Sequence, residues 1–169
     1  MISFLFPDQY MDSVYDIDYE ALMSAGITNL IYDIDNTLQP FDVADPSLET
    51  VELFAGLRGR GYRICLLSNN SHARVESFSA PLQHLSVAFV ARAGKPGRRG
   101  LSRAMAMIGA TNADTALIGD QVFTDVWCAK RNGVYSILVK PLSRRDELSV
   151  KIKRIAERPI VRMYLRSIK

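Results

Sequence analysis

The stretch Leu-Ile-Tyr-Asp-Ile-Asp-Asn-Thr-Leu, residues 30–38, joins the end of an apolar strand to two closely spaced carboxylates. Alternate residues of a strand share a face, so Asp33 and Asp35 can both point at one small volume. Two like charges held together raise each other's pKa. Such a pair persists most easily if a cation lies between the carboxylates, or if one is a nucleophile and the other an acid. The stretch therefore predicts a chemical site at a strand end.

Length and composition favour a single globular domain. The chain has 169 residues, 48% of them hydrophobic, which is enough for a substantial core. We expect one domain over 1–169, with an N-terminal extension at 1–26 and a basic amphipathic tail at 144–169. Neither a bilayer-spanning apolar run nor a secretory signal pattern is present in the sequence. Cys65 and Cys128 lack metal-ligand spacing and fit a reducing compartment, so we expect a cytoplasmic protein.

The net charge of +3 is distributed unevenly along the chain. Residues 1–57 contain eleven Asp and Glu and no Lys or Arg. Residues 58–143 contain twelve basic and four acidic residues, and residues 144–169 contain nine and three. The acidic beginning argues against an Arg-rich transit peptide. The basic remainder favours anionic partners, although most such charge is ordinary solvated surface.

Strand and helix patterns alternate along the chain. Apolar runs predict strands at 27–32, 62–67, 87–90, 116–118 and 134–139. Caps and apolar stripes predict helices at 48–57, 71–80, 96–108 and 124–131. This order is typical of an α/β fold, a Rossmann-like three-layer αβα sandwich with a mainly parallel five-stranded sheet. Ligands of such sheets bind beyond the carboxyl ends of the strands.

Polar side chains follow four of these strands where a ligand should bind. They are Asp33 and Asp35, Ser68-Asn69-Asn70, Lys95, and Gly119-Asp120 with Asp125. The Ser68 hydroxyl, the amide of Asn69 and the charge of Lys95 suit the oxygens of a phosphate group. We therefore expect these three residues to bind a substrate phosphate.

The acidic residues suit the chemistry of phosphate transfer. Asp120 and Asp125, together with Asp33, are hard oxygen ligands that suit Mg²⁺. With the metal and Lys95 neutralising charge, Asp33 can act as the nucleophile. Asp35 can protonate the leaving oxygen and later deprotonate the attacking water. We expect catalysis by Asp33, Asp35, Ser68 and Lys95.

These motifs resemble those of the haloacid dehalogenase (HAD) superfamily of phosphohydrolases. The motif DxDx[TV] is matched by residues 33–37, the strand-end Ser by Ser68, the Lys by Lys95, and GDxxxxD by residues 119–125. The resemblance implies an aspartyl-phosphate intermediate on Asp33. It also implies that the backbone carbonyl of Asp35 is a metal ligand, beside the carboxylates of the other three acids.

The gaps between the motifs are too short for the inserted cap domains of many HAD enzymes. Only 32 residues separate Asp35 from Ser68, and 26 separate Ser68 from Lys95. An uncapped site suits a phosphate on something large, such as a lipid, a protein or a nucleic-acid end.

Roughly residues 4–140 resemble the YqeG family of type IIIA HAD phosphatases, which is similar to phosphatidylglycerophosphate phosphatases. The matching segments are Leu5-Phe6-Pro7-Asp8, Gly26-Ile27, Asp35-Asn36-Thr37-Leu38, Ser68-Asn69-Asn70, Lys95-Pro96 and Gly119-Asp120-Gln121 with Thr124-Asp125. The resemblance implies a Mg²⁺-dependent phosphatidylglycerophosphatase of phospholipid metabolism. Alternatives are a phosphatase for phosphoproteins or nucleic-acid ends, and a catalytically idle binding or assembly factor. Intact Asp33 and Asp35 count against the idle factor, and the lack of an aromatic platform counts against nucleic acid.

Two basic regions favour an anionic lipid partner. In the tail, basic residues are interleaved with apolar ones at helical spacing, and Pro159 is expected to begin a second segment. Such a tail can lie on the inner face of an anionic membrane as a peripheral contact, or it can pack on the sheet with a basic outer face. Near Lys95, a cluster either holds an anionic head group or solvates a helix: Arg92, Arg98, Arg99 and Arg103.

Overall fold

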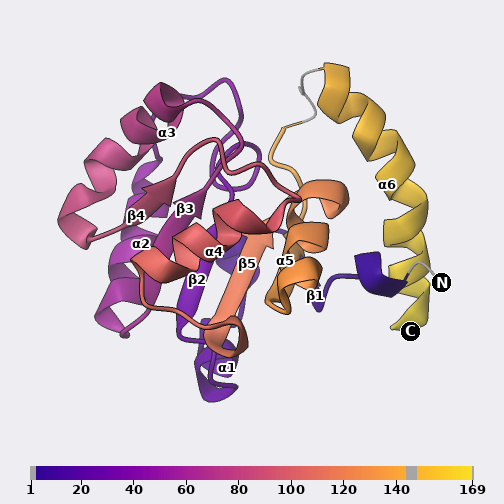
Figure 1. The fold of residues 1–169 in the computed structure, drawn as a ribbon, viewed down its shortest axis with the longest axis horizontal. Coiled ribbons are helices and arrows are strands. Elements are labelled where there is room, and N and C mark those ends of the chain that lie inside the picture. Colours follow the sequence, from indigo (N-terminus) through magenta and orange to yellow (C-terminus); the bar gives the residue numbers. More distant parts are fainter. Residues whose placement is uncertain (1–2, 144–147, 169) are drawn as a thin grey trace.

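Six parallel strands form one sheet in the computed structural model, which describes residues 3–143 and 148–168, with side chains from residue 154 onward in the second range. The strand order is β1-β6-β5-β2-β3-β4 (Figure 1). The strands are β1 (Gln9–Met11), β2 (Asn29–Tyr32), β3 (Arg63–Leu67), β4 (Ala88–Val90), β5 (Thr115–Gly119) and β6 (Tyr135–Val139). The predicted parallel α/β fold is confirmed, with one strand more than the five expected.

Helices cover both faces of the sheet, as in a three-layer sandwich. One face carries α1 (Tyr19–Ser24), α2 (Leu48–Gly59) and α3 (His72–Ser79), and the other carries α4 (Arg98–Met107) and α5 (Trp127–Asn132). Within β2, Leu30 and Tyr32 join the first core while Ile31 joins the second. Because both faces are buried, the strands read as continuous apolar runs. Short helical turns complete the chain at Ser3–Leu5, Val14–Asp16, Ala80–Leu85, Asn112–Asp114 and, as a π-helical turn, Val122–Val126.

Local signals in the sequence set several helix boundaries. The Ser47 hydroxyl accepts a hydrogen bond from the Thr50 N–H at 3.1 Å and so caps α2. Ser71 caps α3 in the same way, because a short polar side chain satisfies a free N–H of the first turn. At the end of α5, Gly133 adopts the left-handed conformation with φ 65°, where a glycine costs least.

Part of the segment expected as an N-terminal extension, 1–26, belongs to the sheet. Gln9–Met11 form the edge strand β1, which pairs with β6, and Tyr19–Ser24 form helix α1. A three-residue strand of intermediate burial has too few positions to show a periodic pattern.

The C-terminal helix α6 (Leu148–Ser167) lies beside the β1 edge of the sheet (Figure 1). It continues through Pro159 without the break that the sequence predicted, although proline removes one helical hydrogen bond. Ile160 and Tyr164 are buried, and Tyr164 meets Phe6 edge-on at 5.8 Å between ring centroids. From residue 154 onward the tail therefore packs on the protein through one face. Of the apolar residues at helical spacing in the first half of the tail, Ile155 is exposed, and Leu148 and Ile152 lie outside the described side chains.

Helices long and apolar enough to cross a bilayer do not occur among the described residues.

Candidate active site

Loops at the carboxyl ends of neighbouring strands build the site. Asp33 directly follows β2, Ser68 follows β3, and Asp120 follows β5, while Lys95 lies in the loop after β4. These four strands are adjacent in the order β5-β2-β3-β4. The Asp33 N–H donates to the Ile118 carbonyl at 2.9 Å, so the first residue after β2 is held against the end of β5.

The Lys95 ammonium lies between two buried carboxylates. Its Nζ is 2.6 Å from Asp33 Oδ1 and 2.6 Å from Asp125 Oδ1. Burial alone would lower the pKa of Lys95, but the charges of Asp125 and Asp33 raise it above its usual value. Burial raises the pKa of Asp33 well above its usual range; Lys95 opposes this rise, and Asp125 and Asp120 add to it. Lys95 is therefore protonated, and it contacts two of the three acids that meet at this site.

The positively charged partner of Asp120 is a side chain of the C-terminal helix α6. Arg154 on α6 places one guanidinium nitrogen 2.5 Å from Asp120 Oδ2 and another 3.3 Å from the Asp120 carbonyl oxygen. Burial raises the pKa of Asp120 to about 6, against the lowering influence of Arg154. Thr37 connects this residue to Asp33, because its hydroxyl lies 3.4 Å from Asp120 Oδ1 and 3.5 Å from Asp33 Oδ2.

Three carboxylates converge closely enough to hold one metal ion. Oxygens of Asp33, Asp120 and Asp125 lie within 4.8 Å of one another, and all three residues are buried. Carboxylate oxygens are the donors that Mg²⁺ prefers. The donor set thus fits a hard divalent cation.

A glycine makes room for one of these carboxylates. An added Cβ on Gly119 would lie 2.3 Å from Asp125 Cγ, closer than any real contact. Asp125 is also fixed by its own turn, since its Oδ2 accepts the Gln121 N–H at 3.1 Å and the Thr124 hydroxyl at 3.3 Å. The glycine of the GDxxxxD pattern therefore has a steric reason to lack a side chain.

The residues after β3 shape the loop that carries Lys95. The Asn69 side chain accepts the Lys95 N–H at 2.7 Å and donates to the Lys95 carbonyl at 3.0 Å. Ser68 is buried, and its hydroxyl oxygen accepts the Asn70 N–H at 3.1 Å. The Asn69 side chain thus positions the backbone of Lys95. The binding of a substrate phosphate by the amide of Asn69 stays a prediction.

The Asp35 carboxylate lies outside the group of three acids. It accepts hydrogen bonds from Arg74 at 3.1 Å and from Asn70 Nδ2 at 3.2 Å. Arg74 also donates to the carbonyls of Val43 and Ala44, so it ties the loop after β2 to α3. The predicted metal contact of Asp35, through its backbone carbonyl, stays a prediction.

Sequence reasoning missed two arginines that touch the predicted acids. Arg74 lies 39 residues after Asp35 and Arg154 lies 34 after Asp120, so no local spacing connects them. Only the packing of α3 and α6 brings them to the site. A further residue, Thr37, was part of the quoted motif but had been given no role.

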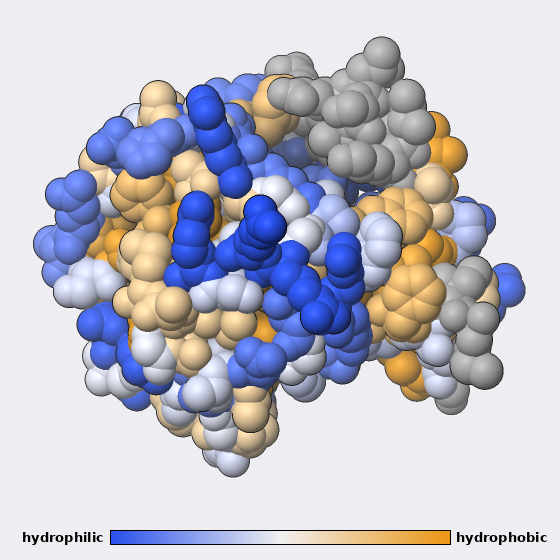
Figure 2. Space-filling model, viewed as in Figure 1, coloured by the Kyte–Doolittle hydropathy of each residue, from blue (hydrophilic) through white to orange (hydrophobic). Residues whose placement is uncertain are grey.

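The four arginines predicted to cluster near Lys95 are all exposed. Hydrophilic side chains gather across this face of the molecule over α4 and α5 (Figure 2). Arg98 and Arg99 begin α4 and are exposed, and Arg103 donates to the Ala91 carbonyl at 3.3 Å. A role of the cluster in anion binding stays a prediction.

Comparison with known proteins identifies the class of protein to which this fold belongs. Residues 92–157 match the family described as HAD-hydrolase-like. The cobalt-bound deoxy-D-mannose-octulosonate 8-phosphate phosphatase of Haemophilus influenzae shares the fold, with a TM-score of 0.55 at 16% identity over 76% of this chain and 73% of that one. A HAD phosphatase of Thermococcus onnurineus has a TM-score of 0.50 at 16% identity, over 61% of this chain and 50% of that one. The fold is that of the HAD-like hydrolases.

Sequence relatives narrow the class to a family. The probable phosphatase YqeG of Bacillus subtilis is 32% identical over 158 residues, which cover 94% of this chain and 90% of that protein. Phosphatidylglycerophosphate phosphatase 1 of Arabidopsis thaliana is 26% identical over 96% of this chain but only 49% of its own length. The chain therefore belongs to the YqeG family of HAD-type phosphatases.

Proposed function

We propose that this phosphatase hydrolyses a phosphomonoester through a phosphorylated Asp33, and that its substrate is phosphatidylglycerophosphate. The observation that carries the proposal is the buried cluster in which Lys95 Nζ lies 2.6 Å from both Asp33 and Asp125, with Asp120 beside them. A nucleophilic carboxylate among compensating charges is what phosphoryl transfer requires.

The reaction has two steps. Asp33 attacks the phosphorus atom, the bond from phosphorus to the leaving oxygen breaks, and the phosphoryl group is transferred to Asp33. Asp35 protonates the leaving oxygen and then takes a proton from the water that attacks the phosphoryl group. Inorganic phosphate leaves and the Asp33 carboxylate is restored. Ser68, the Asn69 amide and Lys95 hold the remaining phosphate oxygens throughout.

Two further groups keep these reactants in place. Arg74 orients the Asp35 carboxylate through its 3.1 Å hydrogen bond. Mg²⁺, held by the carboxylates of Asp33, Asp120 and Asp125, would supply positive charge that offsets the negative charge of the phosphate and the acids.

The open site supports a large substrate. In the described chain, α2 is the helix between β2 and β3, and α3 with one 3₁₀ turn lies between β3 and β4. Neither connection contains an inserted cap domain, so a head group carried by a lipid has access. The similarity to phosphatidylglycerophosphate phosphatase 1 of Arabidopsis thaliana supports the choice of phosphatidylglycerophosphate.

A phosphate-release assay with Mg²⁺ tests the proposal. The substrates are vesicles with phosphatidylglycerophosphate, a phosphopeptide, a 5′-phosphorylated oligonucleotide and para-nitrophenyl phosphate. We expect the highest kcat/KM with the vesicles. Preference for the peptide or oligonucleotide would replace the lipid assignment, and no release from any substrate would contradict hydrolysis altogether.

A further inference from the structure

A cavity of about 730 Å³ opens beside the candidate active site, between α6 and the end of β6. Asp120 lines its inner end, and the same carboxylate lies within 4.8 Å of an oxygen of Asp33. The volume is in the range of sites that hold small organic ligands. Asp120 thus belongs both to the group of three acids and to the lining of this cavity.

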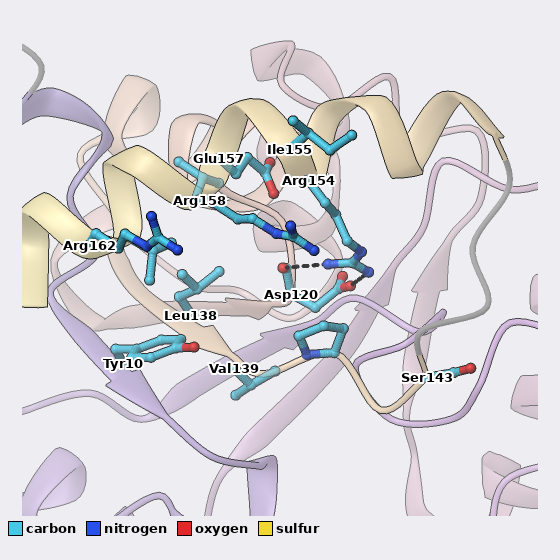
Figure 3. A pocket seen from close by; sticks show the side chains of 13 residues that line it. Tyr10, Asp120, Leu138, Val139, Ser143, Arg154, Ile155, Glu157, Arg158 and Arg162 are labelled. Carbon is cyan, nitrogen blue, oxygen red and sulfur yellow. Dashed lines mark hydrogen bonds and ion pairs between the residues drawn. The ribbon is translucent and has the colours of Figure 1, made fainter.

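One wall of the cavity carries a row of arginines. Arg154, Arg158 and Arg162 follow one another at four-residue intervals on α6 and extend from it toward the strand ends (Figure 3). Residues at this spacing lie on one face of a helix. Arg154 is paired with Asp120. Arg158 and Arg162 are exposed, and no carboxylate among the described residues forms an ion pair with either.

Glu157, the acidic residue that α6 contributes to this cavity, forms no ion pair with Arg158 or Arg162. Glu157 is buried and accepts the Phe123 N–H at 2.8 Å. Two guanidinium groups thus face the cavity as available donors, and guanidinium is the group best suited to bind phosphate in a bidentate manner.

The opposite wall is apolar. Leu138 and Val139 at the end of β6 lie across the cavity from α6 (Figure 3), and Val122 of the π-helical turn also lines it. A cavity with an anion-binding wall and an apolar wall fits an amphiphilic molecule whose polar part is a second phosphate.

We propose that Arg158 and Arg162 bind a phosphodiester of the substrate, adjacent to the phosphomonoester that reacts at Asp33, while the apolar wall receives the glyceride beyond it. This inference rests on the proposed phosphatase activity. It assigns selectivity to α6, a part of the chain outside the strand-end motifs. The occupant is one substrate with two phosphates, one hydrolysed and one held.

The test compares two water-soluble substrates on the full chain. The first is glycerophosphoglycerol phosphate, which has both a phosphodiester and a terminal phosphomonoester; the second is glycerol 3-phosphate, which lacks the diester. We expect Arg158→Gln and Arg162→Gln each to raise KM for the first substrate about tenfold or more, since a charge-assisted hydrogen bond contributes about that much. KM for the second substrate should change less than about twofold. Arg166→Gln, one turn beyond on the same helix but outside the cavity, is the matched control.

A binding measurement separates this inference from the proposed function. Calorimetric titration with glycerophosphoglycerol, the diester without the terminal phosphate, needs no turnover. Weaker binding by the two variants, at an unchanged unfolding temperature, supports the inference even if no hydrolysis is detected. The inference would be overturned if the substitutions raised KM equally for both substrates. It would also be overturned if both variants bound glycerophosphoglycerol as tightly as the wild type does. Variants that lose only vesicle binding would overturn it as well, because the arginines would then contact a membrane and not the substrate.

Discussion

At the scale of single residues, the site is organised by a charge imbalance. Lys95 contacts both Asp33 and Asp125, and Arg154 contacts Asp120. Three buried acids thus share two cations, and burial together with the charges of Asp125 and Asp120 raises the pKa of Asp33. An arriving divalent ion meets donors that are already assembled, although it must compete with Arg154 for Asp120.

Replacement of Asp33 by Asn tests the nucleophile. The amide has nearly the shape of the carboxylate but cannot attack phosphorus, so we expect kcat to fall by about a thousandfold or more. The unfolding temperature should change by less than about 4 °C, because Asp125 still pairs with Lys95. Phosphate release and thermal unfolding followed by circular dichroism provide the two measurements. Asp42→Asn, at an exposed position, is the control, and retained activity in Asp33→Asn would remove Asp33 from this role.

Replacement of Gly119 by Ala tests the packing of Asp125. The new methyl group would lie 2.3 Å from Asp125 Cγ, so the carboxylate must move. We expect a loss of about 1–3 kcal/mol in the free energy of unfolding, as in other overpacked sites, and at least a tenfold loss of kcat/KM.

The matched control is Gly56→Ala, in the interior of α2, where an added Cβ meets nothing within 4 Å. Alanine there should stabilise the protein by about 0.5–1 kcal/mol, because it restricts the unfolded chain. Denaturant unfolding measures both variants. Equal effects of the two substitutions would contradict a specific steric role for Gly119.

At the scale of elements, the sequence predicts those parts whose signal is local. Ser47, Ser71 and Gly133 mark helix ends through their own hydrogen bonds or backbone conformation. The strand β1 was missed because three residues carry no usable period. The continuity of α6 through Pro159 was missed because its packing against the body of the protein outweighs a local helix breaker.

The docking of α6 should depend on pH through Glu157. Burial raises its pKa from 4.5 to about 7, although the Phe123 N–H and Arg154 favour the charged form. In the unfolded chain Glu157 ionises near pH 4.5, whereas in the folded protein it stays protonated until about pH 7. Stability is therefore highest below the unfolded pKa and falls as pH rises through this window, by up to about 3 kcal/mol.

Replacement of Glu157 by Gln removes this pH dependence, because glutamine can still accept the Phe123 N–H but cannot ionise. We expect equal unfolding free energies for wild type and variant near pH 4 and a more stable variant at pH 8. Chemical denaturation at several pH values measures the difference. Glu52→Gln, exposed on α2, should leave the pH profile unchanged, and a constant offset of Glu157→Gln at every pH would contradict the assigned titration.

At the scale of the whole molecule, distant parts of the chain meet at one edge of the sheet. The strand ends supply Asp33, Lys95, Asp120 and Asp125, and their proximity follows from the βα order that the sequence already predicts. The contribution of α6 could not be predicted, because the pairing of Arg154 with Asp120 arises only when the helix packs beside β1 and β6. The acidic N-terminal part of the chain thus supplies Asp33, the basic C-terminal part supplies Arg154, and both residues lie at the same candidate site.

Binding of Mg²⁺ should stabilise the entire fold, because the three acids that would hold the ion are together only in the native state. They follow β2 and β5 or lie in the π-helical turn, and unfolding separates them. An ion at about 100 times its Kd adds about 2.7 kcal/mol to the free energy of unfolding. For a chain of this length that is a rise of about 5–10 °C in Tm.

Thermal unfolding with increasing MgCl₂, and again after addition of EDTA, measures the rise and its reversal without any substrate. In Asp120→Asn the donor set loses a charge, so a given Mg²⁺ concentration should produce a smaller rise, whereas Asp42→Asn should behave as wild type. A rise of equal size in both variants would place the ion elsewhere on the acidic surface. A Tm that does not respond to Mg²⁺ in the wild type would contradict a magnesium site built from Asp33, Asp120 and Asp125.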